Sequence, residues 1–220
     1  MPWPKGHKAL TRDRIVRAAA TAFRGRGVAG VRVDEIMGEA GLTHGGFYAH
    51  FASKDDLLGA ALEHAGGETL KTLAKALESV PPERRLRAVI DTYLSPQHAA
   101  HPDQGCPVAA LGSELARAGG TPRRDLARAV RRRLNWLREV DSPQGRPGPR
   151  DDKVAGALAC MIGGVILARI AGGRDAEALL RSCREFLHES LGEETPPHAP
   201  KRRTVRPRQS KSPRRRTKAG

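Results

Sequence analysis

The stretch that most constrains the fold is residues 41–51, with the sequence GLTHGGFYAHF. The chain has only two Trp, two Tyr and four Phe, yet three of these aromatic residues occur between positions 47 and 51. The preceding residues, 33–40, place apolar side chains at helical spacing, which predicts a short helix. Gly41 can adopt the left-handed conformation that ends a helix, and Thr43 can cap the next one. Two short helices joined by a glycine turn form a helix-turn-helix, whose second helix can enter the major groove of DNA.

Small residues occupy the leading face of this second helix. Gly45 and Gly46 would let its backbone approach a duplex closely, and glycine is a poor helix former where no such need exists. An ordinary packed helical hairpin is the alternative that the spacing alone allows.

The residues around the turn resemble the signature of TetR-family repressors. The resemblance runs from about Thr11 to Leu62 and rests on residues 40–43, Gly45, Phe47, Tyr48, His50, Phe51, Lys54, Leu57 and Leu58. It implies an all-α homodimer, with an N-terminal three-helix helix-turn-helix head and a larger C-terminal helical domain for ligand binding and dimerisation. The implied function is a bacterial repressor that binds a pseudo-palindromic operator in double-stranded DNA and is released by a small-molecule inducer. No cofactor is implied.

The resemblance, together with the composition of the last residues, divides the chain into three expected parts. Residues 1–52 form the DNA-binding domain, residues 53–194 form the ligand-binding and dimerisation domain, and residues 195–220 form a disordered basic tail. The tail holds ten Lys or Arg and no acidic residue, so it carries most of the formal net charge of +15. Because such a tail binds DNA phosphates without reading sequence, a general DNA-coating protein is an alternative function.

The N-terminal segment lacks the apolar core of a signal peptide, and the apolar run at residues 154–168 is short for a membrane span. We therefore expect a cytoplasmic protein with no membrane partner. The sequence also lacks a glycine-rich phosphate loop, a nucleophile elbow and paired carboxylates in a credible cleft, so an enzyme is not expected.

Hydrophobic periodicity and breakers predict the helices. The first would begin with Thr11 as cap, after an irregular arm, and a long helix from Ser53 to about Leu77 would be interrupted or kinked at Gly66 and Gly67. Residues 95–104 are expected to form a loop, and 141–150 another. The remaining helices are expected at residues 84–94, 106–118, 121–140, 151–172 and 174–191.

The resemblance places DNA contacts on two groups of side chains. Polar side chains after the turn can bind phosphate oxygens, and the first residues of the second helix can reach base edges. Arg32 stands where the family often has a capping Ser or Thr, and it could bind a phosphate instead. Phe47 and Phe51 are interpreted as core. The expected DNA contacts are Arg32, Thr43, His44, Gly45, Tyr48, His50 and Lys54.

A ligand pocket is expected between the helix at residues 53–77 and the three helices that follow it. Its expected residues are Tyr93, Cys106, Leu111 and Trp136. Cys106 falls in the first turn of a predicted helix, where a thiolate is favoured. The segment around it resembles electrophile-sensing members of the family, so a redox or electrophile sensor triggered at Cys106 is an alternative. An unreactive buried thiol is the simpler interpretation. His98 and His101 with Cys106 match no standard zinc pattern, and no metal site is expected.

The last two predicted helices combine small residues with apolar faces. Such helices can cross closely, and together they could form half of a symmetric four-helix interface. The expected interface residues are Gly156, Cys160, Gly163, Gly164, Leu179, Cys183, Phe186 and Leu187. A hairpin that packs only within its own chain is the alternative.

Overall fold

The computed structural model describes residues 6–141 and 151–191, and over these ranges the chain is helical without strands. Residues 142–150 and the expected basic tail at 195–220 lie outside the described residues. The elements in order are α1 (His7–Arg26), α2 (Val33–Glu39), the 3-10 helix η1 (His44–Ala49), α3 (Lys54–Lys75), the 3-10 helix η2 (Pro82–Arg84), α4 (Arg85–Tyr93), α5 (Pro96–Ala100), α6 (Pro107–Ala118), α7 (Gly120–Asp141), α8 (Asp151–Ala171) and α9 (Gly173–Leu191).

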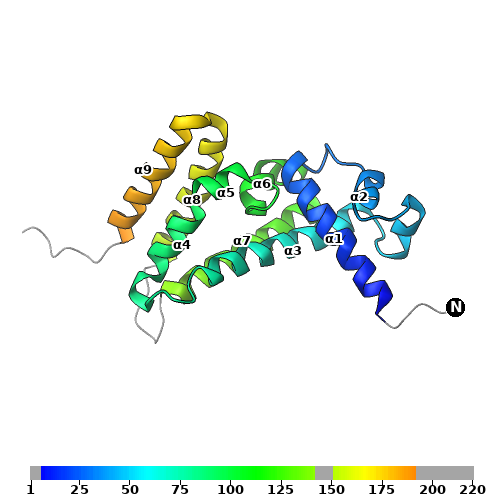
Figure 1. The fold of residues 1–220 in the computed structure, drawn as a ribbon, viewed down its shortest axis with the longest axis horizontal. Coiled ribbons are helices and arrows are strands. Elements are labelled where there is room, and N and C mark those ends of the chain that lie inside the picture. The colour runs from blue at the N-terminus through cyan, green and yellow to red at the C-terminus, as the bar shows by residue number, and fades with distance from the viewer. Residues whose placement is uncertain (1–5, 142–150, 192–220) are drawn as a thin grey trace, which may run out of the picture.

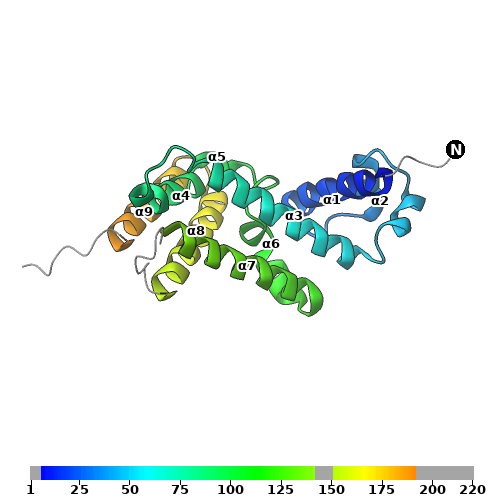
Figure 2. The same cartoon turned by 90° about the horizontal axis from the view of Figure 1, so that it is seen from below.

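The molecule is elongated, and α3 runs from one end toward the other alongside α7 (Figure 1). Helices α1 and α2 with η1 form one end, called here the head (residues 6–52). Helices α3 to α9 form the rest, called the body, in which α8 and α9 lie side by side at the far end from α2 (Figure 2).

Helix α1 begins earlier than the sequence predicts. It starts at His7, after Gly6 in a left-handed conformation, so residues 7–10 are helical rather than an irregular arm. Thr11 is not a cap: it is 7% exposed and lies on the helix face that also carries Ile15 and Ala19. Because positions four apart share one helix face, continuing the helix backwards buries Thr11 against the core.

Helix α3 is capped as expected but is not interrupted. Ser53 Oγ accepts a hydrogen bond from the Asp56 N–H at 3.1 Å, while the Asp56 carboxylate accepts from the Ala52 N–H. The helix runs unbroken through Gly66 and Gly67, so the expected interruption is wrong. Its buried face continues through this region, and tertiary packing outweighs the low helix propensity of glycine.

The segment 95–104, expected as a loop, contains the short helix α5. Ser95 caps it by accepting the His98 N–H at 3.2 Å, and Pro96 occupies the first helical position. Cys106 is the N-cap of α6 rather than a residue of its first turn.

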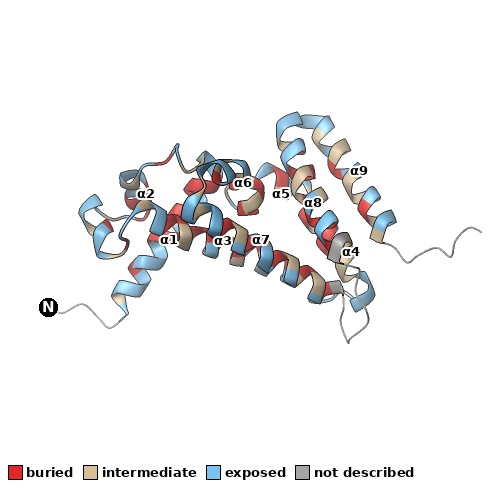
Figure 3. Ribbon diagram, turned by 180° about the vertical axis from the view of Figure 1, so that it is seen from behind, coloured by how far each residue is buried: buried red, intermediate tan, exposed pale blue. Residues whose placement is uncertain are grey.

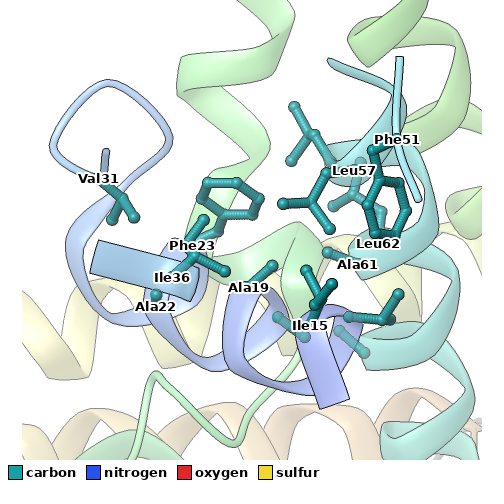
Figure 4. Close-up of a cluster of buried hydrophobic side chains, with 14 of the residues drawn as sticks. Ile15, Ala19, Ala22, Phe23, Val31, Ile36, Phe51, Leu57, Ala61 and Leu62 are labelled. Atoms are coloured by element: carbon teal, nitrogen blue, oxygen red, sulfur yellow. The ribbon is translucent and has the colours of Figure 1, made fainter. Parts of the chain in front are cut away.

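Two clusters of buried apolar side chains hold the chain together. The first joins α1, α2 and η1 to the first half of α3, with contributions from α6 and α7 (Figure 4). Phe23, Ile36, Phe51 and Leu57 meet within it. The second fills the body between α3, α4 and α6 to α9, whose inner faces are buried (Figure 3). Since the first cluster includes side chains of α3, packing is continuous across the expected boundary at residue 52.

Helix α8 is the one described helix that is long and apolar enough to cross a membrane, judged by length and composition alone. It packs against α5, α6, α7 and α9, and Met161 and Val165 are fully buried. Its crossing with α9 is close at Gly164. A Cβ atom at that position would lie 3.0 Å from both Cys183 Sγ and Leu94 Cδ2.

We expect Gly164→Leu to destabilise the fold by about 1–3 kcal/mol, because the added side chain would overpack the α8–α9 crossing. The free energy of unfolding from urea denaturation measures this effect. Gly38→Leu in α2 is the control, since this exposed helical glycine lies outside α8 and α9 and a Cβ atom there meets nothing within 4 Å. Equal stability of the two variants would contradict the packing described for Gly164.

Candidate nucleic-acid interface and ligand cavity

The turn between α2 and η1 is built by glycine and backbone hydrogen bonds. Gly41 has φ of 68°, and its N–H donates to the Gly38 carbonyl at 2.9 Å. The Leu42 N–H donates to the Met37 carbonyl at 2.8 Å. Arg14 of α1 donates to the Ala40 carbonyl at 2.5 Å, which ties the turn to the first helix. This is the predicted left-handed helix end, and it fixes the direction in which η1 leaves α2.

The second helix of the motif is a 3-10 helix, and it presents a polar face. Phe47 is 2% exposed and stacks on Phe51 at 5.9 Å, so both aromatic rings belong to the core as predicted. Tyr48, on the opposite side, is 71% exposed. The remaining leading residues Thr43, His44 and Gly45 are also exposed. The Thr43 side chain makes no capping hydrogen bond, so its expected capping role is wrong.

The first turns of α1 add basic side chains that the sequence analysis did not assign to DNA. Burial lowers the pKa of His50, and the nearby positive charges of Lys8, Arg12 and His7 lower it further. Arg12 also lies over the Phe51 ring at 4.7 Å. The earlier start of α1 is what brings Lys8 and Arg12, one turn apart, beside the end of η1. Because these positive charges repel one another, a bound anion would stabilise the cluster.

Two of the expected phosphate contacts are engaged within the protein. Lys54 donates to the Val28 carbonyl at 2.7 Å and to the Val31 carbonyl at 2.5 Å, so two of the three ammonium protons bind the α1–α2 loop. Arg32 is exposed and pairs with Asp34 at 2.5 Å. The pKa of Asp34 is lowered by its own backbone hydrogen bond and by this arginine.

A cavity of about 630 Å³ lies where α1 meets the body. Its walls come from α1, α3, α4, α5 and the segment before α6, and they include Arg24, Thr69, Tyr93, His98 and Gly105. The volume is in the usual range for a small-molecule site. The cavity shares α3 and α4 with the expected pocket, but it is bordered by α1, α5 and the segment before α6 in place of α6 and α7.

Of the four residues expected in the pocket, Tyr93 alone lines this cavity. Cys106 is fully buried directly behind Gly105. Leu111 packs in the first core cluster. Trp136 lines a separate, shallower groove with Leu77. Little in the sequence indicates the residues that do line the cavity, because the polar residues of α5 and of the loop after it follow no helical periodicity.

His98 is held as a neutral imidazole in the cavity wall. Its Nδ1 lies 2.6 Å from the Tyr93 carbonyl and must donate, while its Nε2 accepts the Cys106 N–H at 3.0 Å. Burial lowers the pKa of His98 to about 4. Arg169 donates to the His98 and Ala99 carbonyls. With both ring nitrogens engaged, His98 is not available as the metal ligand considered from the sequence.

The residues expected at a dimer interface differ in how far their own chain buries them. Gly164 and Leu187 are buried within their own chain, and Cys160 and Cys183 are half-buried. Gly156 and Phe186 are exposed, and Gly163 and Leu179 are half-buried. Further exposed apolar side chains on α8 are Ile166, Leu167 and Ile170.

Comparisons with known proteins agree with this fold and this motif. Residues 15–61 match the family described as "Bacterial regulatory proteins, tetR family". This part of the chain, the helix-turn-helix and the start of α3, is that of a TetR-family protein. It is 32% identical over 123 residues to the HTH-type transcriptional repressor DhaR of Mycobacterium sp. (strain GP1), a match covering 53% of this chain and 58% of DhaR. It is 44% identical over 69 residues to the HTH-type transcriptional regulator TtgR of Pseudomonas putida, covering 31% of this chain and 32% of TtgR. Each match thus spans less than two thirds of the relative's own length.

Solved TetR-family structures share the fold over most of their length. A TetR transcriptional regulator from Chloroflexus aurantiacus superimposes with a TM-score of 0.70 at 24% identity, covering 84% of this chain and 96% of that one. The reduced form of E. coli NemR superimposes with a TM-score of 0.68 at 19% identity, covering 81% and 95%. The TetR-family fold is that of transcriptional regulators.

The neutral state of His98 makes stability depend on pH. The ordinary histidine pKa is 6.5, and in the fold it is about 4, so only the unfolded chain takes up this proton as the pH falls between these values. The contribution of neutral His98 to stability is therefore fully present above pH 6.5 and is lost as the pH falls toward 4. We expect His98 to account for a loss of about 2–3 kcal/mol between about pH 7 and about pH 4.5.

Urea unfolding at both pH values measures this loss, and His98→Gln should show less of it than the wild type. His101→Gln is the control, because His101 is exposed in the same segment. A pH dependence that is the same in all three proteins would exclude the neutral, buried His98.

Proposed function

We propose that this TetR-family chain is a DNA-binding transcriptional repressor that acts as a homodimer and is released from a pseudo-palindromic operator by a small-molecule inducer. The observation that carries the proposal is the exposed face of η1 with Tyr48, together with the basic first turns of α1 beside His50 at the end of η1. Tyr48 can donate to a phosphate, and Lys8 and Arg12 supply positive charge beside His50 at the end of η1. His44 and Gly45 would approach base edges.

Lys54 has a different role in this proposal from the one expected. Its two hydrogen bonds hold the α1–α2 loop against the start of α3, and only its third proton is left for a phosphate. We therefore assign Lys54 mainly to keeping η1 in position. Because Asp34 offsets the charge of Arg32, this arginine would attract a phosphate less strongly than an unpaired one.

Dimerisation is proposed through the outer faces of α8 and α9. Ile170 is 77% exposed and Phe186 of α9 is 60% exposed, and Ile166 and Leu167 lie on the same face of α8 as Ile170. Exposed apolar patches of this kind mark interaction sites, and a twofold contact would pair the patch with itself. Gly164 and Leu187 are left out of this interface because they are buried within one chain.

The inducer is proposed to bind in the 630 Å³ cavity. Two links join the cavity region to the head. Arg24 of α1 donates to the Gly105 carbonyl at 3.0 Å, and Glu114 of α6 accepts the N–H groups of Val28 and Ala29. A ligand that displaces Gly105 or α6 would pull on both links and reorient the head, provided it binds the released conformation better.

The alternative functions are less well supported. An electrophile sensor needs an accessible thiol, and Cys106 is fully buried. A DNA-coating protein would depend on residues 195–220, which lie outside the described residues.

To test the head, an operator is first obtained by letting the protein select DNA duplexes from a random pool. We expect Tyr48→Phe to weaken binding about tenfold, because it removes one hydrogen bond to a charged group. Lys8→Ala should reduce the slope of log affinity against log salt by about one unit. Fluorescence anisotropy over a salt series measures both effects.

Lys71→Ala is the matched control, because Lys71 is exposed on α3 in the body. If Tyr48→Phe and Lys8→Ala bound the selected duplex like this control, the DNA surface would lie elsewhere.

The interface is tested by Phe186→Glu and Ile170→Glu. A charged side chain in a self-paired apolar patch faces its own copy, so we expect both variants to be monomeric with an intact helix content. Sedimentation velocity and circular dichroism measure the two properties. Leu10→Glu, at another exposed apolar residue but in the head, should leave the dimer intact. If Phe186→Glu and Ile170→Glu both formed dimers of unchanged affinity, this surface would not be the dimer interface.

A further inference from the structure

The wall of the 630 Å³ cavity is polar, whereas most small-molecule sites are lined by apolar side chains. Its large apolar or aromatic side chains are Leu73 and Tyr93, and both are almost fully buried. Hydroxyl and amide side chains reach the wall from α1, α3, α4 and the segment 95–104. Those that are exposed or half-buried include Thr21, Thr72, Thr92, Gln97 and Gln104.

An apolar ligand suits such a wall poorly. It would displace water from the hydroxyl and amide groups without replacing the hydrogen bonds, which is unfavourable at each group. A ligand must therefore bring hydrogen-bonding groups of its own, and several of them, because the polar side chains come from four parts of the chain. Hydroxyl groups both donate and accept, so they can pair with threonine and glutamine alike.

The charges of the wall disfavour an anion. Arg24 is the one Lys or Arg among the described residues of the wall, and it is already bound to Glu68 and to the carbonyls of Ala20 and Gly105. Glu68 keeps 44% of its side chain exposed. Asp103 is half-buried, and its carboxylate has no hydrogen bond or ion pair among the described residues. An anion would meet two carboxylates, whereas hydroxyl groups can donate to both.

The wall is held in place before any ligand binds. Both ring nitrogens of His98 are hydrogen-bonded, and Arg24 fixes the Gly105 carbonyl. Asp103 lies against α1, because a Cβ atom at Gly25 would be 3.5 Å from its Cβ. A wall arranged in advance loses little freedom when a ligand binds, and a ligand that contacts Asp103 also reaches the junction with α1.

We propose that the inducer is an uncharged polyhydroxyl compound, a sugar or a polyol, bound in this cavity. Its hydroxyl groups donate to Asp103 and Glu68 and exchange hydrogen bonds with the threonine and glutamine side chains. The volume of about 630 Å³ accommodates a monosaccharide or a disaccharide. This inference deepens the proposed function, on which it rests for the word inducer, because it names the chemical class of the ligand.

Binding can be measured without DNA, which separates this inference from the function of the head. The probes are glucose, ribose, trehalose and myo-inositol at low millimolar concentrations, below those at which excluded sugars stabilise proteins in general. Gluconate is the anionic counterpart of glucose, and cyclohexanol is a counterpart of inositol with a single hydroxyl group. We expect at least one probe to raise the melting temperature of the full-length protein, and gluconate and cyclohexanol to leave it unchanged.

Asp103→Asn keeps the size of the side chain and removes its charge. Because the carboxylate has no partner in the fold, the melting temperature of the free protein should not change. The affinity for the stabilising probe, measured by calorimetry, should fall about tenfold, since a hydrogen bond to a charged acceptor is weakened. Thr72→Val replaces an exposed hydroxyl by a methyl group and should lower the affinity about fivefold. Asp175→Asn is the matched control, because Asp175 is exposed on α9 outside the cavity wall.

Absence of stabilisation by all four probes would overturn the inference, as would equal stabilisation by gluconate or cyclohexanol. Unchanged probe affinity in both Asp103→Asn and Thr72→Val would overturn it too. None of these results would alter operator binding by the wild type. Conversely, a protein that binds a sugar but selects no DNA sequence would retain this site and lose the proposed function.

Discussion

The arrangement of head and body depends on one buried guanidinium. Arg24 leaves α1 and enters the junction, where its side chain is 3% exposed. It donates to the carbonyls of Ala20 and Gly105 and pairs with Glu68 at 3.0 Å. Removing a partner from a buried charge of this kind costs about 3–5 kcal/mol, so the three groups are held together. They belong to α1, α3 and the segment before α6, which form part of the cavity wall together with α4 and α5.

A consequence is that the cavity and the DNA-binding motif share structural parts. The Gly105 carbonyl that binds Arg24 and the Cys106 N–H that binds His98 belong to the same peptide group. A side chain at position 105 would meet His98 Nε2 at 2.8 Å, so only glycine allows this packing. Farther along α6, Glu114 holds the α1–α2 loop from one side while Lys54 holds it from the other. A shift at the start of α6 therefore reaches the loop that positions α2.

The sequence predicts the helices and the motif more reliably than the tertiary contacts. Gly41 in a left-handed turn and Phe47 in the core follow from local rules, since a helix end and a buried face have short-range signatures. The start of α1 does not follow from local rules, because Thr11 is a typical capping residue in the sequence and is buried in the folded chain. Lys54 matches a phosphate-binding pattern, yet its two carbonyl acceptors are 26 and 23 residues away in the chain. Spacing in sequence cannot reveal such partners.

Helix α7 shows the same limit at Arg133, a buried residue that departs from the pattern of its helix face. Helix α7 buries Leu126, Ala129 and Leu137, and this pattern would favour an apolar residue at 133, on the same face. Arg133 breaks the pattern, and the surrounding helices provide it with no complete set of acceptors among the described residues. The sequence alone displays Arg133 as one of three consecutive arginines on an amphipathic helix, and only the packing of α4 and α6 against α7 distinguishes it from its exposed neighbours.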